Sequence, residues 1–212
     1  MKVHTLEEKL DPRHSALLIV DVQNAFCHPK GLRGNAPNFN LIALEAMKAN
    51  LLALLAAARK TGVLRVFIRA IHDEVYVSGP YAEKLYQQRT LGKITLGSWE
   101  ADYWGQELQP KPGAKEAEVL KHRYTAFHGT NLNVILRSNG VKTIIVTGVA
   151  ASGCVMATAM DGFFNDYFVV LATDAVADRD KEAHQVFERR LKASWGDCAT
   201  TKEITRLWKA AR

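Results

Sequence analysis

The sequence of 212 residues has little of what marks several protein classes. Its three cysteines are too few for a disulfide scaffold in a chain of this length. Its first residues do not form a basic, apolar and cleavable leader, and no uninterrupted apolar run approaches the roughly 18 residues of a membrane span. We therefore expect a protein that acts in the cytoplasm and has no membrane partner.

Long runs of one charge are missing as well. The formal net charge is +6, but the 28 lysines and arginines are scattered along the chain, and no five of them are consecutive. Basic stretches interleaved with aromatic residues are also absent. We therefore expect a solvated basic surface and no nucleic-acid partner.

Motifs for cofactors and metals are not found either. The sequence contains no GxGxxG stretch and no P-loop, which removes nucleotide cofactors from the leading interpretations. No pair of cysteines or histidines has the spacing of zinc ligands, and His72-Asp73 is the only hint of a metal site. We expect no cofactor and no metal, and whether His72 contributes to a pocket stays open.

The composition itself is that of an ordinary globular protein. Hydrophobic residues make up 48% of the chain and charged residues 24%, which excludes disorder, collagen and coiled coil for the whole chain. A chain of this length can bury a sizeable core, and no linker or change of composition divides it. We expect one domain over residues 1–212.

Short apolar runs alternate with helical patterns along the chain. Strands are predicted over residues 15–21, 63–70, up to Lys121, 141–149 and 168–173, with a last one around Cys198. Helices are predicted over 40–60, 132–138, 154–164 and 182–194, and residues 71–117 read as an irregular excursion. Because the strands are apolar on both faces, the pattern predicts a three-layer α/β/α domain with a doubly wound, mainly parallel sheet and helices on both faces.

Three chemically distinct side chains follow the ends of predicted strands. Asp21 ends the first strand, Lys121 ends the third, and Cys154 opens a helix after the strongest strand. In an open parallel sheet, ligands bind outside the carboxyl ends of the strands. A carboxylate, an amine and a thiol are therefore expected to meet in one crevice.

Cys154 has the most informative surroundings of the three. A cysteine at a helix start meets the positive end of the helix dipole, which lowers its pKa and favours the thiolate. The small residues 150–153 before it would let a substrate approach backbone N–H groups. Asp21 would accept the thiol proton, and Lys121 would hold both anions. Cys27 and Cys198 lack such a context and are expected to serve packing.

The same residues carry a resemblance to a known family. The stretches ALLIVDVQNAFCHPKG, KHRYTAFHGTNL and TGVAASGCVMATAMDGFFNDY resemble the isochorismatase-like cysteine hydrolase superfamily. The resemblance implies a nucleophile at Cys154, a base at Asp21 and the accompanying Lys121. It also implies a cis peptide bond between Val149 and Ala150, and an oxyanion hole formed by the N–H groups of Ala150 and Cys154.

Within the superfamily, the sequence points in two directions. LGSWEADYWGQELQPKPG and DGFFNDYFVVLATDA look like ureidoacrylate amidohydrolases, whereas SGCV, the downstream ADRD and His184 look like the N-carbamoylsarcosine and maleamate amidohydrolases. RAIHDEVY does not reproduce the Asp-x-His metal cluster of nicotinamidases. The chain departs from the ureidoacrylate group at 151–153 and around 70–72.

The main hypothesis is a cysteine amidohydrolase that cleaves a linear amide or ureido C–N bond in a small molecule. The candidates for substrate contact are Asn24, Trp99, Tyr124 and Phe127. One alternative is a metal-dependent nicotinamidase-like amidase, and another is a non-catalytic binding or scaffold protein of the same fold. Exposed aromatic residues and the habit of the family lead us to expect a homo-oligomer.

Overall fold

A computed structural model of the protein describes residues 2–111 and 113–211. Its strands are β1 (Ser15–Val20), β2 (Leu64–Ala70), β3 (Glu116–Lys121), β4 (Thr143–Val149), β5 (Phe168–Ala177) and β6 (Asp197–Ala199). Its helices are α1 (Leu6–Lys9), α2 (Asn24–Cys27), α3 (Leu41–Thr61), α4 (Gly79–Gln87), α5 (Leu132–Ser138), α6 (Met156–Phe164), α7 (Lys181–Ser194) and α8 (Thr201–Ala210).

The six strands form one sheet in the order β3-β2-β1-β4-β5-β6, and every neighbouring pair is parallel. The chain builds outward from β1 to β3, then returns to β4 on the other side of β1 and builds outward again. This topology confirms the predicted doubly wound α/β domain. Its reversal point lies between β1 and β4, where the carboxyl ends of the strands open a crevice.

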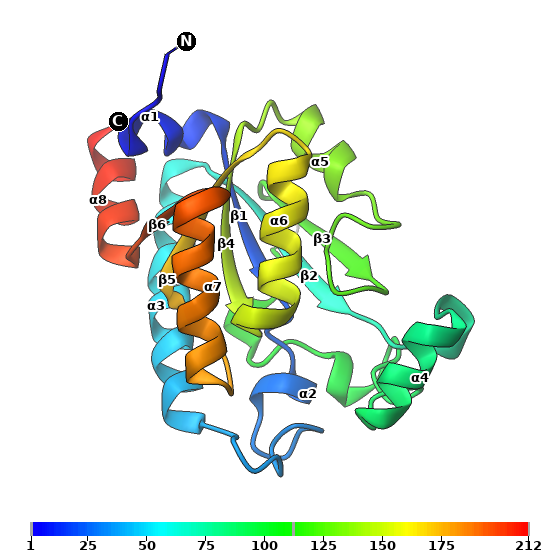
Figure 1. The fold of residues 1–212 in the computed structure, drawn as a ribbon. Coiled ribbons are helices and arrows are strands. Elements are labelled where there is room, and N and C mark those ends of the chain that lie inside the picture. Colours follow the sequence, from blue (N-terminus) through cyan, green and yellow to red (C-terminus); the bar gives the residue numbers. More distant parts are fainter. Residues whose placement is uncertain (1, 112, 212) are drawn as a thin grey trace.

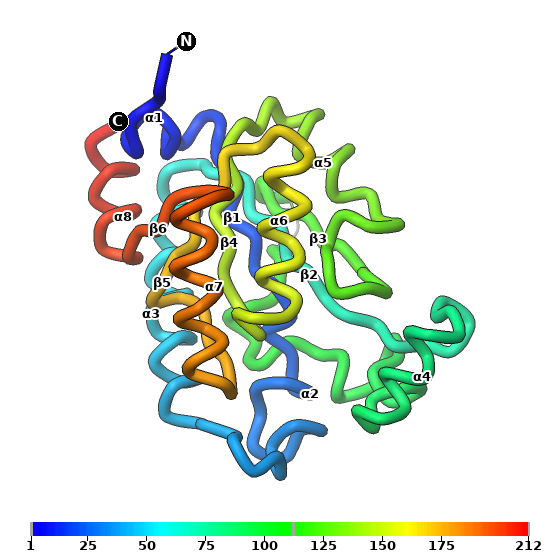
Figure 2. The backbone as a smooth tube through the Cα atoms, viewed as in Figure 1, coloured from blue at the N-terminus to red at the C-terminus, as the bar shows by residue number. Residues whose placement is uncertain are grey.

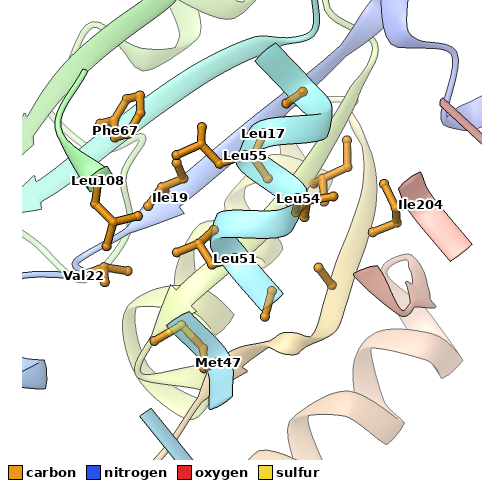
Figure 3. Packing of buried hydrophobic residues seen from close by; sticks show 14 of the residues in the cluster. Leu17, Ile19, Val22, Met47, Leu51, Leu54, Leu55, Phe67, Leu108 and Ile204 are labelled. Carbon is orange, nitrogen blue, oxygen red and sulfur yellow. The ribbon is translucent and has the colours of Figure 1, made fainter. Parts of the chain in front are cut away.

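Helices cover both faces of the sheet (Figure 1). On one face, α3 and α8 pack against the strands; Figure 3 shows Met47, Leu51, Leu54 and Leu55 of α3 around Leu17 and Ile19 of β1. On the other face, α5, α6 and α7 bury a second apolar cluster that includes Leu136, Val155 and Leu191. Alternate residues of β1 enter the two clusters, as expected for a strand buried on both sides.

The helix α3 is apolar enough to mimic a membrane span. An 18-residue window within Leu41–Thr61 has a mean hydropathy of 1.7, so by length and composition alone the helix passes as a membrane-spanning segment. Its apolar residues at helical spacing, from Leu44 to Ala58, are buried against the sheet and α8. This packing makes α3 a core helix of the fold.

Several element boundaries differ from the sequence prediction. β5 continues to Ala177 instead of ending at residue 173, because a register shift opposite Val146 and Gly148 lets the strand pair again with β4. α8 was not predicted, although Thr200 and Glu203 form a capping box at its start.

The tube in Figure 2 shows α1 and α8 at the same end of the molecule, where Lys9 Nζ lies 2.7 Å from Asp197 Oδ2.

The two cysteines expected to serve packing do so. Cys27 has no exposed surface and belongs to the cluster under α3, and burial raises the pKa of its thiol far above the ordinary range. Cys198 is half-buried and packs against the cluster under α7.

Candidate active site

The ends of three strands bring a carboxylate, an amine and a thiol together. Asp21 follows β1, Lys121 is the last residue of β3, and Cys154 lies in a π-helical turn, Ala151–Val155, between β4 and α6. Lys121 Nζ lies 2.8 Å from Asp21 Oδ2 and donates to Cys154 Sγ at 3.2 Å. Since β2 separates β3 from β1, the long lysine side chain must reach past a strand to join these groups.

Asp21 is held in an unusual backbone conformation. Its φ is 54°, in the left-handed region that aspartate enters more readily than most residues, and its N–H donates to the Ile68 carbonyl at 3.0 Å. The side chain is almost fully buried, yet neither carboxylate oxygen has a well-formed hydrogen bond. The ion pair with Lys121 is therefore the main compensation for burying this charge.

Burial and charge set the protonation of the three groups. Burial raises the pKa of Asp21, and Lys121 opposes that rise. Burial and the Asp21 charge raise the pKa of Cys154 to about 12, again against the effect of Lys121. Burial alone would lower the pKa of Lys121, but the interactions with Asp21 and Cys154 outweigh it and raise that pKa. Lys121 therefore stays charged, and Asp21 and Cys154 share one proton as a coupled pair.

The direction of the Cys154 shift corrects the sequence prediction. A helix start was expected to lower the pKa of this thiol, but the regular helix α6 begins only at Met156. In the turn before it, Gly153 departs from helical geometry. Burial and the neighbouring carboxylate dominate there, so they raise the pKa of the thiol instead of lowering it.

The backbone before Cys154 matches the expectation from the resemblance. The Val149–Ala150 peptide bond is cis. Gly148 has a φ of 103°, and a Cβ on it would lie 2.0 Å from the Val20 carbonyl oxygen, so only glycine fits where β4 passes β1. Asp178 Oδ2 accepts from both the N–H and the hydroxyl of Ser152 at 2.7 Å, which fixes the turn on which Cys154 sits.

A cavity of about 470 Å³ is lined by Asp21 and Cys154, and Lys121 is buried behind them. Its walls come from the first strand end, the loop before α3, the excursion around α4 and the turns after β3, β4 and β5. The lining residues are Asp21, Phe26, Arg33, Asn40, Leu44, His72, Gln88, Tyr124, Val149, Ala150, Ser152, Gly153, Cys154, Met156, Ala157, Ala177, Asp178 and Arg179.

Of the four predicted substrate contacts, Tyr124 lines this cavity and the other three do not. Asn24 is buried and donates to the Trp99 carbonyl at 2.9 Å, so its amide holds two loops together. Trp99 is exposed and packs edge-on against His28. Phe127 stacks with Tyr167 on the core under α5 and α6.

Other cavity residues were not identified as substrate contacts from the sequence. The cavity is also lined by Arg33, Gln88, Asp178 and Arg179. Of these four residues, only Asp178 and Arg179 belong to a motif named above, the ADRD stretch. The open question about His72 is answered, because this residue lines the cavity too. Burial and the nearby charge of Lys121 lower the pKa of His72 to about 3, so the ring is neutral.

The described residues show no group of three or more His, Cys, Asp or Glu side chains close enough to hold a metal ion. Near His72, the Asp73 carboxylate accepts from the Val75 N–H. His122 Nδ1 lies 3.0 Å from the Ile71 carbonyl, and its ring stacks on Tyr76.

Comparison with known proteins identifies the family of this chain. The family model for the isochorismatase domain matches residues 15–203. A solved cysteine hydrolase from Pseudomonas syringae is similar at 25% identity with a TM-score of 0.82, covering 95% of both chains. An isochorismatase family protein from Desulfovibrio vulgaris is 28% identical with a TM-score of 0.75, covering 94% of this chain and all of that one.

A third similar structure is the N-carbamoylsarcosine amidase of Thermoplasma acidophilum. It is 27% identical, with a TM-score of 0.68, and the match covers 88% of this chain and 96% of that one. The family model spans most of the sequence, and Lys121 contacts both Asp21 and Cys154, the other two residues to which the resemblance assigns a role. The chain belongs to the isochorismatase-like hydrolase family.

Proposed function

We propose that this hydrolase cleaves a linear C–N bond in a small amide or ureido compound, with Cys154 as the nucleophile. The observation that carries the proposal is the position of Lys121 Nζ, within 2.8 Å of the Asp21 carboxylate and 3.2 Å of the Cys154 sulfur. A cation in contact with both groups keeps a base and a nucleophile side by side in a water-poor site.

The first half of the reaction forms a thioester. Asp21 accepts the thiol proton, and the sulfur of Cys154 attacks the carbonyl carbon of the substrate. The N–H groups of Ala150 and Cys154 then stabilise the oxyanion of the tetrahedral intermediate. Asp21 returns its proton to the substrate nitrogen, the C–N bond breaks, and ammonia or an amine leaves.

The second half releases the product. Asp21 accepts a proton from water, and the resulting hydroxide attacks the thioester carbonyl. The C–S bond breaks, the acyl or carbamoyl group leaves with the added oxygen, and Asp21 returns the proton to the Cys154 sulfur. Lys121 stays protonated throughout, because Asp21 and Cys154 hold its pKa above the ordinary range.

The test is an ammonia-release screen over ureido acids, biuret-like compounds, maleamate and nicotinamide. The best substrate should acylate Cys154, which mass spectrometry of the rapidly quenched enzyme detects. Cys154→Ala should lower turnover by at least roughly 10⁴-fold while leaving the circular dichroism spectrum unchanged. Cys198→Ala is the matched control, since that half-buried thiol lies outside the cavity, and its turnover should stay near wild type.

Two results would contradict the proposal. Turnover of Cys154→Ala within tenfold of wild type would remove the cysteine mechanism, and no ammonia from any compound would favour a binding or scaffold protein. Elemental analysis separates the nicotinamidase-like alternative, because zinc or iron bound in a 1:1 ratio, and activity lost on chelation, would support a metal-dependent amidase. The homo-oligomer and the cytoplasmic location stay predictions, which size-exclusion chromatography and cell fractionation check.

A further inference from the structure

Two aspartates near the end of β5 each hold a distant segment in the same way. Asp174 Oδ1 accepts from the N–H and the hydroxyl of Thr201, at 2.7 Å and 2.8 Å. Asp178 Oδ2 accepts from the N–H and the hydroxyl of Ser152, both at 2.7 Å. Hydrogen bonds to a carboxylate are stronger than those between neutral groups. Each aspartate therefore clamps one residue at two points, and we refer to these contacts as the Asp174 clamp and the Asp178 clamp.

The two clamps hold segments with different tasks. Thr201 is the first residue of α8 and does not line the cavity. Ser152 lies in the turn Ala151–Val155, two residues before Cys154, and both Ser152 and Asp178 line the cavity. The Asp174 clamp therefore supports a helix of the core, whereas the Asp178 clamp acts on the turn that carries the nucleophile.

The Asp178 carboxylate is itself fixed by the chain around it. Its other oxygen, Oδ1, accepts from the N–H of Asp180, the N-cap residue of α7, at 3.0 Å. The residue before it, Ala177, pairs with Val149 in the sheet. Ser152 is therefore held against a frame made of β5 and the start of α7.

The N–H groups of the turn are committed to different acceptors. The Ser152 N–H donates within the Asp178 clamp. The N–H groups of Gly153 and Val155 donate to the Ala150 carbonyl at 3.0 Å and 3.2 Å. The two donors of the proposed oxyanion hole, Ala150 and Cys154, are not among these three. Their direction depends on a turn that the clamp holds in place.

The value of such a clamp is geometric. An oxyanion hole works only when its donors point at the position where negative charge develops. Displacing reacting groups by about 1 Å can cost roughly 10²-fold in rate. Regular helix geometry does not hold this turn, because Gly153 has a φ of −116° and a ψ of −107°. A carboxylate in the same wall would repel the oxyanion, so its charge alone would not favour the reaction.

We propose that Asp178 is a positioning residue for the oxyanion hole and acts through Ser152. Its carboxylate holds the turn so that the N–H groups of Ala150 and Cys154 meet the carbonyl oxygen of the substrate. This inference rests on the proposed function. It gives Asp178 a part in the chemical step and none in binding the substrate.

The first test is the kinetics of Asp178→Ala with the best substrate of the ammonia-release screen. Because oxyanion donors act in the transition state, kcat should fall by roughly 10²-fold while KM changes by less than about threefold. Asp178→Asn keeps an oxygen acceptor for Ser152 and should recover most of the lost kcat.

Alkylation of Cys154 by iodoacetamide distinguishes the oxyanion hole from the nucleophile. This reaction forms no oxyanion, and the charges that shift the pKa of Cys154 belong to Asp21 and Lys121. The alkylation rate of Asp178→Ala should therefore stay within about twofold of wild type. A general loss of structure in the site would lower both rates together.

Asp174→Ala is the matched control, since it removes the same pair of bonds from the other clamp. It should lower the melting temperature about as much as Asp178→Ala does, whereas its kcat should stay within about twofold of wild type. This comparison separates a lost contact in the fold from a displaced oxyanion hole.

A double-mutant cycle tests whether Asp178 acts through Ser152. Ser152→Ala keeps the N–H half of the clamp and should lower kcat by roughly threefold to tenfold. In the Asp178→Ala background the same change should have no further effect, because the hydroxyl has already lost this acceptor.

Hydrogen–deuterium exchange tests the clamp without any substrate. The N–H groups of Gly153 and Val155 should exchange faster in Asp178→Ala and at the wild-type rate in Asp174→Ala. Faster exchange in a protein that releases no ammonia from any compound would keep the clamp and contradict the amidohydrolase.

Several results would overturn the positioning role and leave the proposed function intact. They are a kcat of Asp178→Ala within about threefold of wild type, an equal loss of kcat and of the alkylation rate, and an equal loss of kcat in Asp174→Ala. Additive effects of the Asp178 and Ser152 changes, or unchanged exchange at Gly153 and Val155, would do so as well.

Discussion

Strand β3 carries a buried ionic cluster at each of its two ends. At its start, the fully buried Glu116 side chain accepts from Arg59 at 2.8 Å and from Arg65 at 3.2 Å. At its end, Lys121 contacts Asp21 at 2.8 Å and Cys154 at 3.2 Å. The two clusters use similar charges at similar distances, at the first and last residues of a six-residue strand.

They differ in how completely their polar atoms are satisfied. Glu116 accepts from two arginines and from the Lys111 N–H, so its pKa is lowered even though burial alone would raise it. Asp21 has one ion pair and no well-formed hydrogen bond, so burial prevails and its pKa is raised. The first carboxylate is stable in its charged form, whereas the second is ready to take up a proton.

The two clusters also lie at opposite edges of the sheet. Glu116 lies at the amino end of a parallel strand and does not line the cavity described above, while Asp21 and Lys121 lie at the carboxyl ends, beside the crevice. A buried ion pair is thus no sign of reactivity by itself. Incomplete hydrogen bonding at the ligand-binding edge of the sheet distinguishes the reactive cluster from the structural one.

The strongest test of this difference between the Glu116 and Asp21 clusters is Asp21→Asn, which keeps the shape of the side chain and removes the base. Turnover should fall by roughly 10³–10⁴-fold, because no group accepts the thiol proton or activates water. Alkylation of Cys154 by iodoacetamide near neutral pH should become faster instead. The Asp21 charge is one cause of the raised Cys154 pKa, and without it Lys121 favours the thiolate.

Slower turnover together with faster alkylation of Cys154 is the result expected when a base lies beside a thiol. Cys198, whose pKa burial raises to about 11, is an internal reference in the same mass-spectrometric experiment and should react at an unchanged rate. Turnover close to wild type would show that Asp21 is not the base. Slower alkylation of Cys154 would show that the Asp21 carboxylate does not keep the Cys154 thiol protonated.

The next largest effect is expected for Lys121→Met, which removes the cation but keeps the length of the side chain. Turnover should fall by roughly 10²–10⁴-fold, less than for Cys154→Ala. Asp21 would then be buried without a counter-charge, so its folded-state pKa should lie further above the unfolded value of about 3.9.

The sign of the pH effect on stability follows from that shift. A carboxyl with a raised folded-state pKa contributes stability that is complete below the unfolded pKa and is lost as the pH rises through the folded one. Thermal melts of Lys121→Met should therefore show a larger loss of stability at about pH 8 than at about pH 4.5. Lys142→Met, at an exposed lysine, is the control and should melt like wild type at both. A near-wild-type rate for Lys121→Met would assign the lysine a purely structural role.

The reactive cluster was predictable from the sequence for a physical reason. Apolar runs show where parallel strands end, and parallel topology brings those ends to one edge of the sheet. Asp21, Lys121 and Cys154 could therefore be placed together without a structure. Their relative pKa values could not, because burial and the exact neighbours of Cys154 depend on the turn that precedes α6.

The cavity wall was less predictable. Arg33 and Gln88 lie in segments without apolar periodicity, and their contact joins residues 55 positions apart. Phe127 was expected to contact the substrate, but it packs on Tyr167 instead. By contrast, α8 carried a readable signal in Thr200 and Glu203, so its omission reflects a missed capping box rather than a long-range contact.

The smallest effect on catalysis is expected at the structural cluster, in Glu116→Gln. The change keeps a hydrogen-bond acceptor for Arg59 and Arg65 but removes the charge, so turnover should stay within about threefold of wild type. The free energy of unfolding near neutral pH should fall by roughly 1.5–3 kcal/mol, the range for hydrogen bonds to a charged group.

The pH dependence of that loss has the opposite sign to the one expected for Lys121→Met. The pKa of Glu116 is lowered in the folded protein, so its contribution is present above the unfolded pKa of about 4.3 and disappears as the pH falls through the folded-state pKa. Urea titrations of wild type and Glu116→Gln should diverge above about pH 5 and converge in acid. If the variant lost turnover as Lys121→Met does, the two ends of β3 would be coupled, and complete hydrogen bonding would not separate a structural cluster from a reactive one.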